Sequence, residues 1–240
     1  MSEQTVPPGT PREERRRALW AHVVPFGAWL FLMHMLGDPA GWKYAVRSAA
    51  CLGLLAALRP WRGYAAPRAR NLLFALGAGV AVFVLWVGPE SAWMDRLPAL
   101  KDFYLAWAVT PLGRAPEPLK TFPYAPEVCG WAWSVARLLG SALVIAPVEE
   151  FFWRGFVYRW MIKSDFLAVD LRAFRAGVFL GVSFVFGLEH DRWLAGALAG
   201  MAYGWVMIRT GDVWAAAFAH FVTNFLLGLY VLAAGAYGFW

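Results

Sequence analysis

The sequence predicts an all-α protein, a polytopic transmembrane helical bundle of seven or eight helices. Of its 240 residues, 60% are hydrophobic and only 16% are charged. Its mean hydropathy is +0.48, and its 15 Trp and 18 Phe exceed what a soluble domain of this length could bury. Long apolar runs also recur along the chain, as they do in proteins that cross a membrane several times.

Seven apolar runs approach the length of a membrane helix. Crossing a hydrocarbon core of ~30 Å takes about 20 helical residues, and the runs are 19–37, 44–58, 71–89, 131–152, 174–190, 193–208 and 213–236. An eighth helix is expected from the apolar patch Phe103 to Leu112 or from a break within 131–162. The apolar stretch 131–162 is longer than one helix needs to cross the bilayer.

The chain divides into a short tail and one membrane domain. Residues 1–18 form a polar basic tail that also contains acidic residues. The apolar run that follows has no small-residue cleavage site, so we expect no removable signal peptide. No polar linker separates a second domain within 19–240. In this domain, residues 19–130 hold the first helices and an external loop.

The distribution of arginine predicts the orientation, because cytoplasmic loops collect Lys and Arg. Three stretches are rich in arginine: the tail before Leu19, the 59–70 connection and the 159–175 connection. The 89–130 segment has nearly balanced charge and seven prolines, which suits an external loop. We therefore expect an integral protein of the bacterial inner (cytoplasmic) membrane with a cytoplasmic N-terminus. Lipid headgroups and topology also explain the net charge of +6, so no nucleic-acid partner is expected.

Two adjacent carboxylates and an arginine lie in the most apolar part of the chain, where charges are costly and often functional. On a helix, Glu150 and Arg154 are four residues apart, in the favourable order for an ion pair. Glu149 points about 100° away from Glu150 and is left free. Pro147 cannot donate to the carbonyl of Leu143, so the helix is expected to kink or open where the acids begin. The alternative is that these charges mark the helix emerging into the cytoplasm.

Two histidines lie on other apolar runs. His190 follows Phe186 at the end of the fifth run, and His220 with Asn224 lies on one face of the seventh. A single intramembrane histidine more often forms a hydrogen bond between helices than it catalyses a reaction. Polar clusters on three helices, which together offer carboxylates, imidazoles and a carboxamide, favour a hydrolytic site instead.

These three clusters, in this order, resemble the motifs of the CPBP family, the CAAX proteases and bacteriocin-processing enzymes that include the Ras-converting prenyl-protein endopeptidases. The motifs are Glu149-Glu150-x-x-x-Arg154-Gly155, Phe186-x-x-x-His190 and His220-x-x-x-Asn224. The resemblance covers about residues 131–228, which would be the catalytic core, and it implies a CAAX-protease-like helical fold.

The resemblance implies a glutamic-type intramembrane protease that needs no cofactor. Glu149 would be the general base that activates a water, and His190 would help to hold and polarise this water. His220 and Asn224 would donate hydrogen bonds to the tetrahedral oxyanion, an interaction worth ~3 to 4 kcal/mol in a dry site. Glu150 and Arg154 would be a supporting pair, and Phe186 a supporting residue of the second motif.

Three other kinds of protein stay open. A metal-dependent membrane protease could use Glu149, Glu150, His190 and His220 as ligands, although no His-Glu-x-x-His is present. A non-catalytic immunity or assembly factor would bind another membrane protein. A transporter could use intramembrane acids and histidines as a proton relay, but the sequence shows no repeat halves.

The expected substrate is a membrane-associated protein or peptide precursor, cut near its C-terminus in a sorting tail or a CAAX-like end. The external loop that opens with Gly88-Pro89-Glu90-Ser91-Ala92-Trp93 resembles the sorting-associated members of the family, which are linked to exosortase or myxosortase systems.

Three features are expected to be structural. Small residues on one face, Gly196, Gly200 and Gly204 on one helix and Gly177 and Gly181 on the preceding one, predict close helix packing. Arg47 and Arg137 are expected to snorkel or to pair within the bundle. His190 and His220 flank a predicted helix of ~24 Å, so tilt or a short helix facing a cavity is needed to bring them together.

Overall fold

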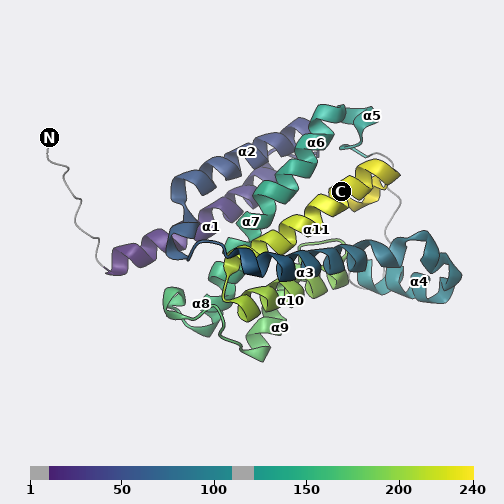
Figure 1. Ribbon diagram of the computed structural model, residues 1–240. Helices are drawn as coiled ribbons and strands as arrows, with labels where there is room; N and C mark the ends of the chain where they lie inside the picture. Colours follow the sequence, from purple (N-terminus) through teal and green to yellow (C-terminus); the bar gives the residue numbers. More distant parts are fainter. Residues whose placement is uncertain (1–10, 110–121) are drawn as a thin grey trace.

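The computed structural model describes residues 11–109 and 122–240, and within these ranges every regular element is helical. Figure 1 shows the helices packed as one bundle, with α1, α2 and α6 forming one side and α3, α9 and α10 the other. Helix α11 passes between the two groups. The predicted all-α fold class is confirmed.

The first three apolar runs form α1 (Pro11–Met35), α2 (Gly41–Leu58) and α3 (Ala69–Val87), with the short 3-10 helix η1 (Pro60–Gly63) between the last two. Helix α1 begins eight residues before the predicted Leu19, so the second part of the predicted polar tail is helical. Glu13 and Glu14 lie in its first turn, where carboxylates favour the positive end of a helix. Residues 1–10 of the tail lie outside the described residues.

The predicted external loop is partly helical. It contains η2 (Gly88–Glu90), η3 (Ala92–Arg96), α4 (Pro98–Tyr104), the π-helical turn η4 (Leu105–Val109) and α5 (Pro126–Cys129). The apolar patch Phe103 to Leu112 is therefore helical as far as Val109, and its last residues lie outside the described part. A helix from 98 to 109 rises only about 18 Å, which is too short to cross a bilayer.

Residues 131–162 form one unbroken helix, so the alternative of a break within this stretch is wrong. It consists of α6 (Trp131–Leu139), η5 (Gly140–Ile145), α7 (Ala146–Glu150), η6 (Phe151–Val157) and α8 (Tyr158–Ile162), in which η5 and η6 are π-helical. The predicted opening near Pro147 takes the form of these wider turns, which flank the two acids. A π-helical turn lets the helix continue while one backbone bond is lost to proline.

The last three runs form α9 (Ala176–Leu188), α10 (Trp193–Thr210) and α11 (Val213–Ala234), with the 3-10 helices η7 (Phe166–Ala168) before and η8 (Tyr237–Phe239) after them. The glycine face of α10 packs closely on α9, as predicted: a Cβ on Gly196 or Gly200 would lie 3.0 or 3.1 Å from a backbone Cα of α9. The expectation for Gly177 and Gly181 is wrong, because a Cβ at either would meet nothing within 4 Å. Ser183 and Gly187 provide the contact on α9 instead.

Four helices of the described chain are long and apolar enough to span a membrane: Arg12–Met35, Ala69–Glu90, Trp131–Ile162 and Val213–Ala234. Helices α2, α9 and α10 occupy the other three predicted runs, but they fall outside this group; α9 has 13 residues and rises only about 20 Å. The protein is an integral membrane protein in which shorter helices pack against the spanning ones.

The described contacts gather the three arginine-rich stretches at one end of the bundle. Arg15 lies 4.0 Å from the carboxylate of Asp165, and Arg159 donates to the hydroxyl of Tyr64 at 3.2 Å. We call this the arginine-rich end. At the other end, the loop end, Arg192 forms an ion pair with Glu90. Figure 1 shows the start of α1 and α8 on the left, and α4 and α5 on the right.

Candidate active site

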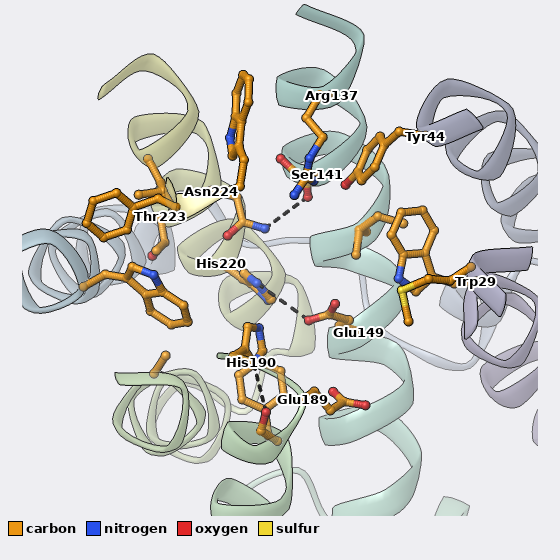
Figure 2. Close-up of a pocket in the computed structure, with 18 of the residues that line it drawn as sticks. Trp29, Tyr44, Arg137, Ser141, Glu149, Glu189, His190, His220, Thr223 and Asn224 are labelled. Carbon is orange, nitrogen blue, oxygen red and sulfur yellow. Dashed lines mark hydrogen bonds and ion pairs between the residues drawn. The ribbon is translucent and has the colours of Figure 1, made fainter. Parts of the chain in front are cut away.

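A cavity of about 380 Å³ lies inside the bundle, between α1, α2, the long 131–162 helix, the α9–α10 turn and α11. Its walls carry Glu149, His190, His220 and Asn224, the four residues for which the sequence suggested catalytic roles. Figure 2 shows Glu149 and His220 facing each other, with His190 and Glu189 below them and Asn224, Arg137 and Tyr44 above. The structure therefore brings the three sequence clusters to one place.

The two adjacent glutamates have different surroundings. Glu150 is completely buried, and its Oε1 accepts a hydrogen bond of 2.9 Å from Arg154, which is the predicted ion pair. Glu149 points into the cavity, and its Oε2 has no hydrogen-bond partner among the described residues. As helical periodicity predicted, one carboxylate is held and the other is left to face the cavity.

His220 links the two carboxylates. Its Nδ1 lies 2.9 Å from Oε1 of Glu150, and its Nε2 lies 3.8 Å from Oε2 of Glu149. Because a carboxylate only accepts, Nδ1 of His220 carries the proton in this contact and Nε2 faces the cavity. Tyr203 stacks on the imidazole with ring centroids 4.6 Å apart, which fixes the plane of the ring.

His190 is held by its own helix. Its Nδ1 donates to the carbonyl of Phe186 at 3.0 Å, which leaves Nε2 as an acceptor. Since the side chain folds back along α9, its ring lies 5.0 Å from the ring of Phe186, and His220 lies 6.0 Å from that same ring. This backward turn brings together two histidines that the predicted helix lengths had kept apart.

Asn224 contacts the long helix at its π-helical turn. Its Nδ2 donates to the carbonyl of Ser141 at 3.1 Å, which Figure 2 shows as a dashed line. A carboxamide nitrogen has two N–H groups, so one is used in this contact and the second remains for another acceptor.

Arg154 connects the acids to the neighbouring helices. One guanidinium nitrogen contacts Glu150 and the other donates to the carbonyl of Gly200 at 3.0 Å. The guanidinium also lies 4.3 Å from the centre of the Phe186 ring. The close packing of α9 on α10 thus places a backbone acceptor and an aromatic face where this buried cation needs them.

Several cavity residues escaped the sequence analysis. Glu189 lines the cavity and accepts a hydrogen bond of 3.0 Å from Trp153 Nε1; its position beside His190 at the end of an apolar run was the available signal. Tyr203 and Trp86 contact the two imidazoles, but nothing in the sequence separates them from other aromatic residues. Arg47 and Arg137 also line the cavity. Among the described residues neither has a carboxylate partner, and both lie against the ring of Tyr44.

The described residues contain no group of three or more His, Cys, Asp or Glu side chains arranged to hold a metal ion. Glu150, one of the four ligands considered from the sequence, already accepts from Arg154 and His220 through the same oxygen. Besides Glu149, the cavity contains the carboxylate of Glu189, the imidazoles of His190 and His220 and the carboxamide of Asn224.

The second half of the chain matches a known protein family. Residues 131–226 fit the model of the family described as type II CAAX prenyl endopeptidase Rce1-like. Searches of curated proteins and of solved structures find no match. The matched segment contains the long helix, α9, α10 and most of α11, and therefore all three of the clusters described above. Residues 131–226 are therefore similar to the Rce1-like type II CAAX prenyl endopeptidases, and this similarity points to a protease of the CAAX type that acts in a membrane.

Proposed function

We propose that the protein is a glutamic-type intramembrane endopeptidase that hydrolyses a peptide bond near the C-terminus of a membrane-associated protein or peptide precursor. The observation that carries this proposal is the convergence of Glu149, His190, His220 and Asn224 on one cavity. The substrate would end in a C-terminal sorting tail or in a CAAX-like sequence, and the protein would need only the lipid bilayer as a further partner.

Glu149 is the general base of the proposed reaction. Among the described residues its Oε2 has no hydrogen-bond partner, so it can take a proton from a water in the cavity. Nε2 of His190 is an acceptor because Nδ1 is bound to Phe186, and it accepts a hydrogen bond from the second O–H group of the same water, which orients the water's lone pair while this hydrogen stays on the oxygen. The water oxygen then attacks the peptide carbonyl, and the proton on Glu149 passes to the leaving amine, which gives a carboxylic acid and a free amine.

His220 and Asn224 stabilise the negative charge that develops on the peptide oxygen. The second N–H of Asn224 is free for this contact, because the first is bound to Ser141. Nε2 of His220 faces the same cavity and donates when it carries a proton. Removal of one such donor costs about 10²–10³-fold in rate in comparable sites.

Glu150, Arg154 and Phe186 position these groups. Glu150 holds Nδ1 of His220, Arg154 holds Glu150, and the ring of Phe186 contacts both imidazoles and Arg154. None of the three needs to touch the substrate to affect the reaction.

We further infer that the arginine-rich end faces the cytoplasm of a bacterial cell and that the loop end faces outward. The positive-inside rule supports this orientation, together with the contacts that gather the three arginine-rich stretches at one end. An epitope at the N-terminus would then be digested by an added protease in inside-out vesicles and protected in right-side-out ones.

Cleavage of a quenched fluorescent CAAX peptide in proteoliposomes tests the proposed reaction. Glu149→Gln is expected to lower kcat by about 10²–10⁴-fold, the range for general acid–base catalysis, and His190→Ala, His220→Ala and Asn224→Ala should each lower it as well. Matched controls are Glu127→Gln and His34→Ala, which change exposed side chains outside the cavity. Glu149→Gln and the two control variants should keep their thermal unfolding temperatures near that of the unchanged protein.

The same assay separates the alternatives. Loss of cleavage on treatment with a zinc chelator, reversed by added zinc, would show a metal-dependent protease. Unchanged cleavage in the Glu149→Gln variant would contradict its role as the base. If the Glu149, His190 and His220 variants all retain the protein's biological activity, the chain is a non-catalytic binding protein.

A further inference from the structure

Two arginines that have no acidic partner among the described residues lie in the wall of the proposed catalytic cavity. Arg47 comes from α2 and is only 7% exposed, and Arg137 comes from α6. No described carboxylate lies within ion-pair distance of either guanidinium, and the Nε atom of each is buried without a hydrogen bond. Buried charges are costly unless they are paired, so this arrangement calls for an anion.

Aromatic rings hold the two guanidiniums in place. Arg47 lies 4.5 Å from the ring of Trp29 and 5.2 Å from that of Tyr44, and Arg137 lies 4.1 Å from Tyr44 and 4.8 Å from Tyr124. Ring faces attract and orient a cation but do not neutralise it. The two cations therefore share one ring, Tyr44, and keep N–H groups for a bidentate acceptor such as a carboxylate.

This pair of arginines and the proposed catalytic groups belong to the same cavity. Arg137, Ser141, Ile145 and Glu149 all line it, at intervals of four residues along one helix. Tyr44, whose ring contacts both guanidiniums, lines the same cavity as Glu149. Figure 2 shows Arg137 and Tyr44 at one end of this lining, and His190 and Glu189 at the other.

We propose that Arg47 and Arg137 bind the C-terminal carboxylate of the peptide substrate and so set the distance from the chain end to the bond that is cut. This inference rests on the proposed function and adds its recognition step. Glu149 follows Arg137 by 12 positions, or about 18 Å of α-helix. An extended peptide spans about 3.3–3.6 Å per residue, so about five residues separate the scissile bond from the carboxylate.

A peptide carboxylate fits this place better than a lipid phosphate, the other common anion of a membrane. The arginines lie in the wall of the cavity that contains Glu149, and Arg47 is almost completely buried. The cavity has one cationic region and one region with acidic and imidazole groups, which matches a peptide end that carries a carboxylate at one position and the scissile bond at another.

Binding of labelled peptides tests the subsite without relying on cleavage. The probe is a fluorescein-labelled peptide with an S-farnesyl cysteine near its end, prepared with a free C-terminal carboxylate or with a carboxamide. In nanodiscs of phosphatidylcholine, the unchanged protein should bind the carboxylate form about 10- to 100-fold more tightly, as expected for loss of a charged hydrogen bond. Arg47→Gln and Arg137→Gln should reduce this ratio toward one, and the Lys variants should keep part of it.

The ratio of the two affinities, for the carboxylate peptide and for the carboxamide peptide, distinguishes a recognition defect from damage to the fold. A misfolded variant loses binding of both peptides equally. Arg62→Gln, which removes an exposed arginine outside the cavity, should leave the ratio unchanged. Adding one residue after the cysteine should move the cut by one residue, so that its distance from the C-terminus stays constant.

Equal binding of the two peptide forms, or no binding of either, overturns the proposal. Loss of the carboxylate preference in nanodiscs of phosphatidylglycerol would assign the arginines to a lipid phosphate and would also overturn it. These outcomes are independent of the Glu149→Gln experiment. A carboxylate preference alongside normal cleavage by that variant would instead leave the subsite in place and contradict the role of Glu149.

Discussion

Replacing one member of the buried ion pair Glu150 and Arg154 should strongly lower the free energy of unfolding. Replacing both residues should lower it by no more than the more damaging single replacement does. The side chains are 0% and 3% exposed, and their closest atoms are 2.9 Å apart. Removal of one partner of such a pair leaves an unpaired buried charge, which costs about 3–5 kcal/mol. In Glu150→Gln that charge belongs to Arg154, and in Arg154→Met it belongs to Glu150.

The expected change in unfolding temperature follows from this cost. For a chain of this size, 1 kcal/mol corresponds to about 2–4 °C, so each single variant should unfold about 6–20 °C lower. The double variant Glu150→Gln with Arg154→Met contains no unpaired charge and should fall no further than the less stable single variant. Tryptophan fluorescence in detergent, followed during heating, measures these shifts.

The exposed ion pair of Asp95 and Lys101 provides the matched control, since its side chains are 62% and 24% exposed. An exposed pair contributes about 0–1 kcal/mol, and Lys101→Gln should therefore shift the unfolding temperature by less than about 4 °C. Additive losses in the double variant of Glu150 and Arg154 would refute the reasoning, because they would show that neither charge depends on the other.

Two further predictions concern packing. A Cβ on Gly187 would lie 2.5 Å from the carbonyl oxygen of Trp193, whereas a Cβ on Gly177 would meet nothing within 4 Å. The variant Gly187→Ala should therefore reduce the yield of folded protein, and Gly177→Ala should leave it unchanged. Equal yields of the two variants, measured by size-exclusion chromatography in detergent, would contradict the close packing of α9 on α10. Of the two free cysteines, Cys51 is fully buried and Cys129 is partly exposed, so a maleimide should label Cys129 first and Cys51 only on unfolding, as mass spectrometry of the modified peptides would show.

The positions of the helices were predictable because each needs a long apolar surface. All seven predicted runs contain a helix, and the first and fourth extend beyond the prediction, to Pro11 and Ile162. Charged residues conceal such extensions: Glu13 and Glu14 lie in the first turn of α1, where acids stabilise the start of a helix although they lower its hydropathy. The π-helical turns of the 131–162 helix were predictable only as a local opening near Pro147.

The site was partly predictable. The division between Glu149 and Glu150 follows from helical periodicity, which acts within one helix and can be recognised in the sequence. The contact between His220 and Glu150 joins residues 70 positions apart, and the backward turn of His190 depends on the end of α9. Arg47 and Arg137 meet at Tyr44 only because α2 packs against α6. Such long-range contacts are set by tertiary packing and leave no pattern in a single sequence.

The unbroken 131–162 helix carries residues proposed for substrate recognition and residues proposed for cleavage, one after the other along its axis. From its N-terminal side it carries Arg137, then Ser141, which holds Asn224, then Glu149 and the pair of Glu150 and Arg154. Arg137 also lies 5.8 Å from the ring of Trp240, at the loop end of the bundle. A peptide bound as proposed must therefore extend its C-terminus toward the loop end. A break in this helix would separate the carboxylate subsite from the base. The π-helical turns continue the helix without interrupting it, and this continuity keeps the two sites at a fixed distance.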